Sequence, residues 1–179
     1  MAASRIFRLK GFHAARTADI CAEAGLSAGT VFRHFSDKRT IIATIANREL
    51  AHFQQVMQRL STREGLQRVT RMSERDLAEF LRPTAYDLGF DSRLELYRDE
   101  KARIQLMAVV DAIHTALAAT LAGGQQEGWV RKAVDPAGLA NMILAVFLGL
   151  TVNQAIGAPT SSSSTAAALA NLFRSFIHV

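Results

Sequence analysis

The chain has 179 residues, of which 49% are hydrophobic, 21% are charged and only 7% are aromatic. This length and composition exclude a disordered or fibrous protein and favour a helical globule with a sizeable core over a β-sandwich or barrel. The single cysteine, Cys21, cannot form an internal disulfide, and the chain opens without the pattern of a secretory signal, so we expect a cytoplasmic protein.

The positive charge is concentrated in the first third of the chain. The formal net charge is +5 at pH 7, and residues 1–63 hold ten Lys and Arg against four Asp and Glu. Residues 64–179 hold eleven against twelve. Such asymmetry indicates an anionic partner for the N-terminal part, either nucleic acid or a membrane surface.

Hydrophobic residues recur with helical spacing almost throughout, and no run reads as a strand, so we predict an all-α fold. A first helix is expected from the start of the chain to about Lys10, with Gly11 as its C-terminal stop. Its apolar stripe already includes Met1, Ala3 and Phe7. We therefore expect that the natural chain had further residues upstream of Met1.

The next segment has the features of a helix-turn-helix, expected over about residues 16–35. Residues 17–24 form a short helix that Gly25 ends in a left-handed conformation, and Ser27 is a suitable N-cap for a second helix from Ala28 to about Phe35. Two short helices joined by a glycine-containing turn in basic surroundings are typical of this motif. The side chains expected to pack both helices against the first are Ile20, Ala24, Leu26, Val31 and Phe35.

Ser36 and Asp37 can cap a fourth helix from about Lys38 to Leu60, which at about 1.5 Å per residue is long enough to join two domains. We place a DNA-binding domain at residues 1–45 and a helical ligand-binding and dimerisation domain at residues 46–179.

The second domain is predicted to contain at least four further helical segments. They are expected around 77–81, from 93 to 124, from 136 to about 155 and from 166 to about 177, with a serine-rich loop and cap at 161–164.

No charged residue occurs between Pro136 and Phe173. The strongest apolar run, 139–152, is shorter than the 18 to 20 residues that a membrane span needs, so we predict buried or interface helices and no membrane partner. This apolar surface predicts a homodimer through the last two helices.

The outer, N-terminal side of the third helix carries residues with which a protein can read DNA. Arg33 can donate two hydrogen bonds to guanine, Thr30 can contact thymine or a phosphate, and His34 can do either. The small Ala28 and Gly29 let the helix N-terminus approach a phosphate, and Lys38 can hold a second phosphate as a point charge. On spacing alone, these side chains fit a solvated basic face equally well.

The residues of this segment resemble a known family. Gly11-Phe12 and the run from Asp19 to Lys38 are similar to the DNA-binding domain of TetR-family transcriptional regulators. Gly128-Trp129-Val130, then Asp135-Pro136 and the apolar helix to Gly149, are similar to the family's variable regulatory domain.

The resemblance implies a three-helix DNA-binding head, a connecting fourth helix, and a helical domain that dimerises and often binds a small-molecule effector. Effector binding would shift the spacing of the two heads. The expected function is a ligand-responsive repressor that binds a palindromic operator as a homodimer. The DNA contacts that it implies are bases for Thr30, Arg33 and His34, proximity to the groove for Ala28 and Gly29, and phosphates for Thr17, Ser27, Phe32 and Lys38.

Three features depart from the family pattern. Phe32 stands where the family usually has a tyrosine, Ala15 replaces a common serine or threonine cap, and the first helix lacks its usual upstream extension. They motivate an alternative function, a helical small-molecule-binding or interaction protein with a weakened DNA-binding head.

An effector site would lie among the later helices, where apolar side chains alternate with a few polar groups. The candidate lining residues are Phe80, Tyr86, Met107, Asp111, His114, Asn141, Met142 and Phe147. For each of them a place in the core or a structural hydrogen bond is the stronger interpretation, so we expect only a few of the eight to line a cavity, and the sequence does not identify the effector.

Enzymatic and metal-dependent functions lack support. Residues 25–29 fit G-x-S-x-G, but a nucleophile elbow needs a strand before the serine, and here a helix precedes it. The five histidines show no metal-ligand spacing with a carboxylate or cysteine. We therefore expect no enzyme, no metal and no cofactor.

Overall fold

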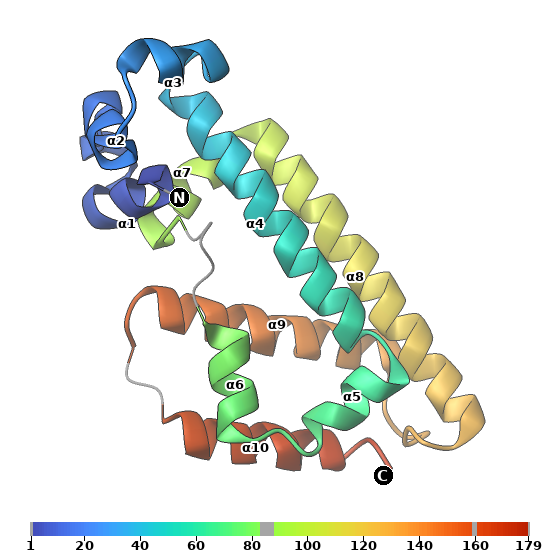
Figure 1. The fold of residues 1–179 in the computed structure, drawn as a ribbon. Coiled ribbons are helices and arrows are strands. Elements are labelled where there is room, and N and C mark those ends of the chain that lie inside the picture. Colours follow the sequence, from blue (N-terminus) through green and yellow to red (C-terminus); the bar gives the residue numbers. More distant parts are fainter. Residues whose placement is uncertain (1, 83–87, 159–160, 179) are drawn as a thin grey trace. The chain divides into compact units, whose positions relative to one another are not determined.

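The structure is a computed structural model that describes residues 2–82, 88–158 and 161–178. Within these ranges the chain forms ten α-helices and no strand (Figure 1). A single antiparallel bridge pairs Val130 with Ile177 in the same ranges. The predicted all-α class is confirmed.

The contacts divide the chain into two compact units, and each is built from two separate stretches of sequence. Two long helices, α4 (Lys38–Leu60) and α8 (Glu100–Glu127), contribute residues to both units. Unit 1 comprises Met1–His52 and Pro83–Met107, and unit 2 comprises Phe53–Arg82 and Ala108–Val179.

Unit 1 holds the predicted helix-turn-helix. Its helices besides parts of α4 and α8 are α1 (Ala2–Ala14), α2 (Thr17–Ala24), α3 (Ala28–His34) and α7 (Phe90–Arg98). Gly25, at φ 64°, ends α2 in the left-handed region, as the sequence predicts. Gly11, at φ 71°, kinks α1 but does not end it, so α1 continues to Ala14 and beyond the predicted end at about Lys10. The fully or nearly buried core residues include Ile6, Phe7, Phe12, Ile20, Val31, Ile41, Ile42 and Leu88.

Three of the five side chains predicted to pack α2 and α3 occupy this core or its edge. Ile20 and Val31 are buried, and Phe35 packs against the cluster. Ala24 and Leu26 are exposed instead, Leu26 to 49%. The left-handed turn at Gly25 follows Ala24 directly, and the chain around it remains at the surface, so the prediction for these two residues was wrong.

Unit 2 consists of helices packed around one apolar core. Besides parts of α4 and α8 it contains α5 (Arg63–Val69), α6 (Glu74–Leu81), α9 (Pro136–Ala155) and α10 (Ser162–Arg174). α10 packs against α5 and α6, and α6 packs against α9 (Figure 1). The most deeply buried side chains include Met57, Leu66, Leu117, Leu121, Ile143, Phe147 and Phe173.

Local capping changes two predicted helices and begins one that was not predicted. The expected helix from 93 to 124 is broken at Asp99, whose carboxylate accepts a hydrogen bond from the Ala102 backbone N–H at 2.9 Å and begins α8. α5 was not predicted from the sequence, and the Thr62 side chain caps it. α10 begins four residues earlier than predicted because Ser161 acts as its N-cap.

By length and composition alone, α8 and α9 are each apolar enough to cross a membrane. Five residues of α9 are buried within unit 2, namely Leu139, Ala140, Ile143, Leu144 and Phe147. Two such helices are weak evidence for a membrane protein, because a core helix of a soluble protein passes the same test.

Two adjacent glycines in α8 lead to a prediction of opposite effects. A Cβ at Gly124 would lie 2.6 Å from atoms of Trp129 and Val130, which are buried, whereas a Cβ at Gly123 would meet nothing within 4 Å. We expect Gly124→Ala to lower the free energy of unfolding by about 1–3 kcal/mol through overpacking. Gly123→Ala should raise it by up to about 1 kcal/mol through helix propensity. Urea unfolding of both variants checks this, and equal effects would contradict the packing at Gly124.

Candidate nucleic-acid interface

α3 begins at a well-formed cap. The Ser27 side chain accepts a hydrogen bond from the Thr30 backbone N–H at 3.2 Å, and the two hydroxyl groups lie 2.9 Å apart. Ser27 therefore satisfies one of the free N–H groups in the first turn of α3. The cap and the turn at Gly25 set where α3 starts.

One side of α3 is anchored and the other is free. Val31 is 6% exposed in the core of unit 1, and Phe35 follows it one turn later at the edge of the same core. Six of the predicted DNA-contact residues lie on α3, and all six are exposed: Ala28, Gly29, Thr30, Phe32, Arg33 and His34. Phe32, a large apolar side chain beside Arg33, is 50% exposed.

The remaining three predicted DNA contacts lie in different environments. Thr17 is the first residue of α2 and is half-buried, and Ser27 is exposed. Lys38 is half-buried at the start of α4, and its Nζ donates hydrogen bonds to the carbonyl oxygens of Phe12, His13 and Ala15. Its ammonium is thus engaged within unit 1.

Ion pairs between α1 and α2 occupy both acidic side chains of α2. Arg5 contacts Glu23 at 3.0 Å, and Lys10 contacts Asp19 at 2.9 Å. The hydrogen bond from Lys10, followed by that from the Arg16 backbone N–H, holds the pKa of Asp19 below its usual value. Arg33, on the neighbouring helix α3, is exposed.

Asp37, which precedes α4, leads to a prediction about acid stability. The Thr40 backbone N–H, at 2.7 Å, and the Thr40 hydroxyl, at 3.0 Å, donate to its carboxylate and lower the pKa of Asp37. A lowered folded pKa contributes stability above the unfolded value of about 3.9, and this contribution is lost as the pH falls through the folded pKa. Asp37→Asn keeps a capping side chain without the charge, so its unfolding temperature should fall less between pH 5 and pH 2. An equally steep fall for both proteins would contradict this role.

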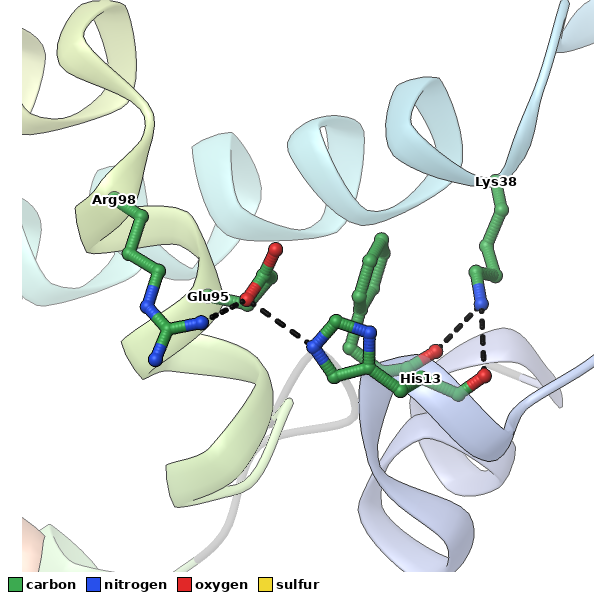
Figure 2. Close-up of polar contacts among 5 residues, drawn as sticks. His13, Lys38, Glu95 and Arg98 are labelled. Atoms are coloured by element: carbon green, nitrogen blue, oxygen red, sulfur yellow. Dashed lines mark hydrogen bonds and ion pairs between the residues drawn. The ribbon is translucent and has the colours of Figure 1, made fainter.

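The helix α7, which is distant in sequence, completes unit 1. Leu88, just before it, is fully buried in the unit 1 core, and α7 packs against α1. Arg93 forms an ion pair with Glu49 of α4. Glu95 contacts His13 at 3.4 Å and Arg98 at 3.2 Å (Figure 2). These residues were not predicted from the sequence, because no local pattern links 88–98 to the N-terminal helices.

The structure scatters most of the candidate effector residues. Phe147 is 1% exposed, and its ring lies 4.9 Å from that of Phe80 in an edge-to-face contact, so both belong to packed regions of unit 2. His114 Nε2 lies 3.1 Å from the Ala137 carbonyl oxygen. Met107 is 63% exposed in unit 1. Asp111, Asn141 and Met142 are exposed, and Tyr86 lies outside the described residues.

Met142 lines an apolar groove of about 380 Å³ between α9 and α10. The other lining residues are Val134, Asp135, Gly138, Leu139, Leu172, Ser175 and Phe176. No local sequence signal marks this groove, because its walls come from residues 134–142 and 172–176, which lie about 30 residues apart in the chain. Among the described residues no group of three or more His, Cys, Asp or Glu side chains is placed to hold a metal ion.

The fold and the exposed basic side of α3 define an all-α protein with an N-terminal helix-turn-helix. Residues 1–45 match the family model described as bacterial regulatory proteins, tetR family. No curated protein sequence matches the chain. The match covers the predicted DNA-binding segment, so residues 1–45 are similar to the DNA-binding part of the tetR family of bacterial regulatory proteins.

Three solved structures of transcriptional regulators have the same fold along nearly the whole chain. PfmR, a TetR family transcriptional regulator from Thermus thermophilus, is 20% identical, with 96% of this chain and 94% of that chain covered and a TM-score of 0.69. FadR of Bacillus subtilis, determined in complex with stearoyl-CoA, is 20% identical, with 99% of this chain and 96% of that chain covered and a TM-score of 0.68. SmeT, the repressor of the Stenotrophomonas maltophilia multidrug efflux pump SmeDEF, is 19% identical, with 99% of this chain and 87% of that chain covered and a TM-score of 0.69.

Proposed function

We propose that the protein is a cytoplasmic, ligand-responsive transcriptional repressor that binds a palindromic operator as a homodimer. The observation that carries this proposal is the exposed side of α3, with Thr30, Arg33 and His34, in a segment that matches the family model. A helix-turn-helix places the N-terminal residues of its second helix against base edges in the major groove. The other described helices of unit 1 hold that helix in place.

Each exposed residue of α3 has a physical role in the proposed complex. Arg33 donates two hydrogen bonds to guanine, and Thr30 and His34 contact neighbouring bases. The small Ala28 and Gly29 allow the helix to lie close to the groove. Thr17, Ser27 and Phe32 lie along the DNA backbone, where Phe32 contributes van der Waals contact only because it has no hydroxyl group.

The proposed dimer interface is the exposed side of α9 and α10. Val152, near the end of α9, is 36% exposed, and Ile156, the C-cap of α9, is 56% exposed. No charged residue occurs in 136–173, which includes all of α9 and most of α10. An uncharged apolar surface of this kind favours association of two copies about a two-fold axis.

The proposed effector is a small molecule bound within unit 2. FadR, which shares the fold, was determined in complex with stearoyl-CoA, and SmeT is described as a repressor. The candidate residues on these two helices are Met107, Asp111 and His114 on α8 and Asn141, Met142 and Phe147 on α9, and Met142 also lines the groove between α9 and α10. Binding there would change the operator affinity by favouring one arrangement of the two DNA-binding heads.

The proposal is tested by selecting random-sequence DNA duplexes with the purified full-length chain and then titrating the enriched duplex at two salt concentrations. The expected result is a palindromic sequence whose affinity falls steeply with salt, since several phosphate contacts release counterions. No enriched sequence and weak binding at both salt concentrations would contradict it. That outcome would favour a helical small-molecule-binding or interaction protein with a weakened DNA-binding head.

Phe32→Tyr is expected to tighten binding to the enriched duplex without changing the preferred sequence. The half-exposed ring lies on the DNA-facing side of α3, and a hydroxyl group there adds a hydrogen bond to the DNA backbone. One such bond contributes about 0.5–1.5 kcal/mol, which corresponds to roughly a 2- to 12-fold gain per subunit. Titration of the enriched duplex and a scrambled duplex checks this. Unchanged or weaker binding would count against the placement of Phe32.

A further inference from the structure

Lys38 occupies a closely fitting polar site at the junction of α1 and α4. Its Nζ lies 2.6 Å from the Phe12 carbonyl oxygen, 2.9 Å from that of Ala15 and 3.3 Å from that of His13. The same nitrogen lies 4.4 Å from the centroid of the Phe12 ring. Figure 2 shows the Lys38 side chain reaching from the start of α4 to the backbone at His13.

The backbone of this region explains why these carbonyl groups need a donor. Gly11, at φ 71° and ψ 170°, interrupts α1, and only one further turn follows before Arg16 takes an extended conformation at the N-cap of α2. The carbonyl groups of this last turn therefore have no following helical N–H groups. A lysine ammonium has three N–H donors, and its positive charge is favourable at a helix C-terminus.

We propose that Lys38 is a positioning residue for DNA recognition, which caps the last turn of α1 and fixes it to the start of α4, and that it does not bind a phosphate. This inference rests on the proposed function, in which α3 reads DNA. Only Phe35, Ser36 and Asp37 separate α3 from Lys38. Fixing the start of α4 on α1 thus also fixes where α3 ends.

The donor count separates this role from the phosphate contact that the family resemblance implies. All three N–H groups of Lys38 are used by the three carbonyl groups, so a phosphate contact would require at least one of these hydrogen bonds to break. Arginine distinguishes the two roles as well. A planar guanidinium binds phosphate well. Its N–H groups lie in one plane on three nitrogen atoms, so they cannot all point at three carbonyl oxygens that converge on a single position.

The test compares Lys38→Met, Lys38→Arg and the control Lys101→Met in the full-length chain. Lys101 is exposed in the first turn of α8, so the control removes the same charge by the same substitution. Thermal unfolding is measured first, without DNA. Both Lys38 variants should unfold roughly 4 °C or more below the control, because each loses the cap.

Affinity for the duplex enriched by the wild type is then measured across a series of salt concentrations. We expect both Lys38 variants to bind more weakly, with slopes of log affinity against log salt within about 0.3 of the wild-type slope. Loss of a phosphate contact would instead lower the slope in Lys38→Met by about 0.9 per contact.

A lowered slope in Lys38→Met, together with wild-type binding by Lys38→Arg, would overturn the inference. Unfolding temperatures of both Lys38 variants equal to that of the control would also overturn it, whether or not DNA binds. Failure of the wild type to bind any duplex would instead contradict the proposed function, and the unfolding measurement would still decide the capping role.

Discussion

Arg33→Ala is expected to abolish most of the sequence preference of the protein. Arg33 is exposed on α3, and a bidentate pair with guanine contributes about 1–3 kcal/mol of discrimination. Since a symmetric dimer reads two half-sites, the loss is about 2–6 kcal/mol per dimer, or at least about 30-fold in affinity for the enriched duplex. Affinity for a scrambled duplex should change much less. Parallel titrations of both duplexes measure the difference.

The matched control is Arg39→Ala, which removes an exposed arginine from the first turn of α4. Loss of a positive charge without base contacts should weaken both duplexes by a similar factor. If Arg33→Ala also weakened both duplexes equally, α3 would not read the base sequence through Arg33.

Phe147→Ala is expected to cause the largest loss of stability. Phe147 is 1% exposed in unit 2, and its ring lies 4.9 Å from that of Phe80 and 6.3 Å from that of Phe173, both in edge-to-face contacts. Truncation of a buried phenylalanine costs about 3–5 kcal/mol through lost burial and the cavity that remains. For a chain of this size the unfolding temperature should fall by roughly 6 to 20 °C. Calorimetry or circular dichroism measures it.

Phe32→Ala is the control for this prediction, because the same substitution there removes a half-exposed ring from α3. Its effect on the free energy of unfolding should stay below about 1 kcal/mol. Equal unfolding temperatures for the two variants would contradict the packing of Phe147 in the core. They would reopen its assignment to an effector site.

The elements that the sequence predicted well are those with local start and stop signals. α2 and α4 have the predicted bounds, Thr17–Ala24 and Lys38–Leu60, because Gly25 ends α2 in the left-handed region and Asp37 accepts a hydrogen bond in the first turn of α4. The break at Asp99 was not predicted, because the helical spacing of apolar residues continues across it. The only local signal for the break is one capping carboxylate, that of Asp99.

The candidate site was predictable to the same extent. The exposed side of α3 follows from the helical period and from Val31 as its anchor. Contacts between distant segments were not predictable: Lys38 reaches the carbonyl group of Phe12 26 residues away, and Leu88 joins the core of unit 1 from the later part of the chain. The candidate effector residues were chosen by chemical type, and type alone does not determine which helices face each other.

A paired selection decides whether α3 reads DNA sequence. Random-sequence duplexes are selected in parallel by the wild-type chain and by a variant with Thr30, Arg33 and His34 all replaced by alanine. These three side chains are exposed, so the variant should keep the wild-type unfolding temperature. The account predicts a palindromic sequence for the wild type and no enriched sequence for the variant. Enrichment of the same sequence by both proteins would contradict it.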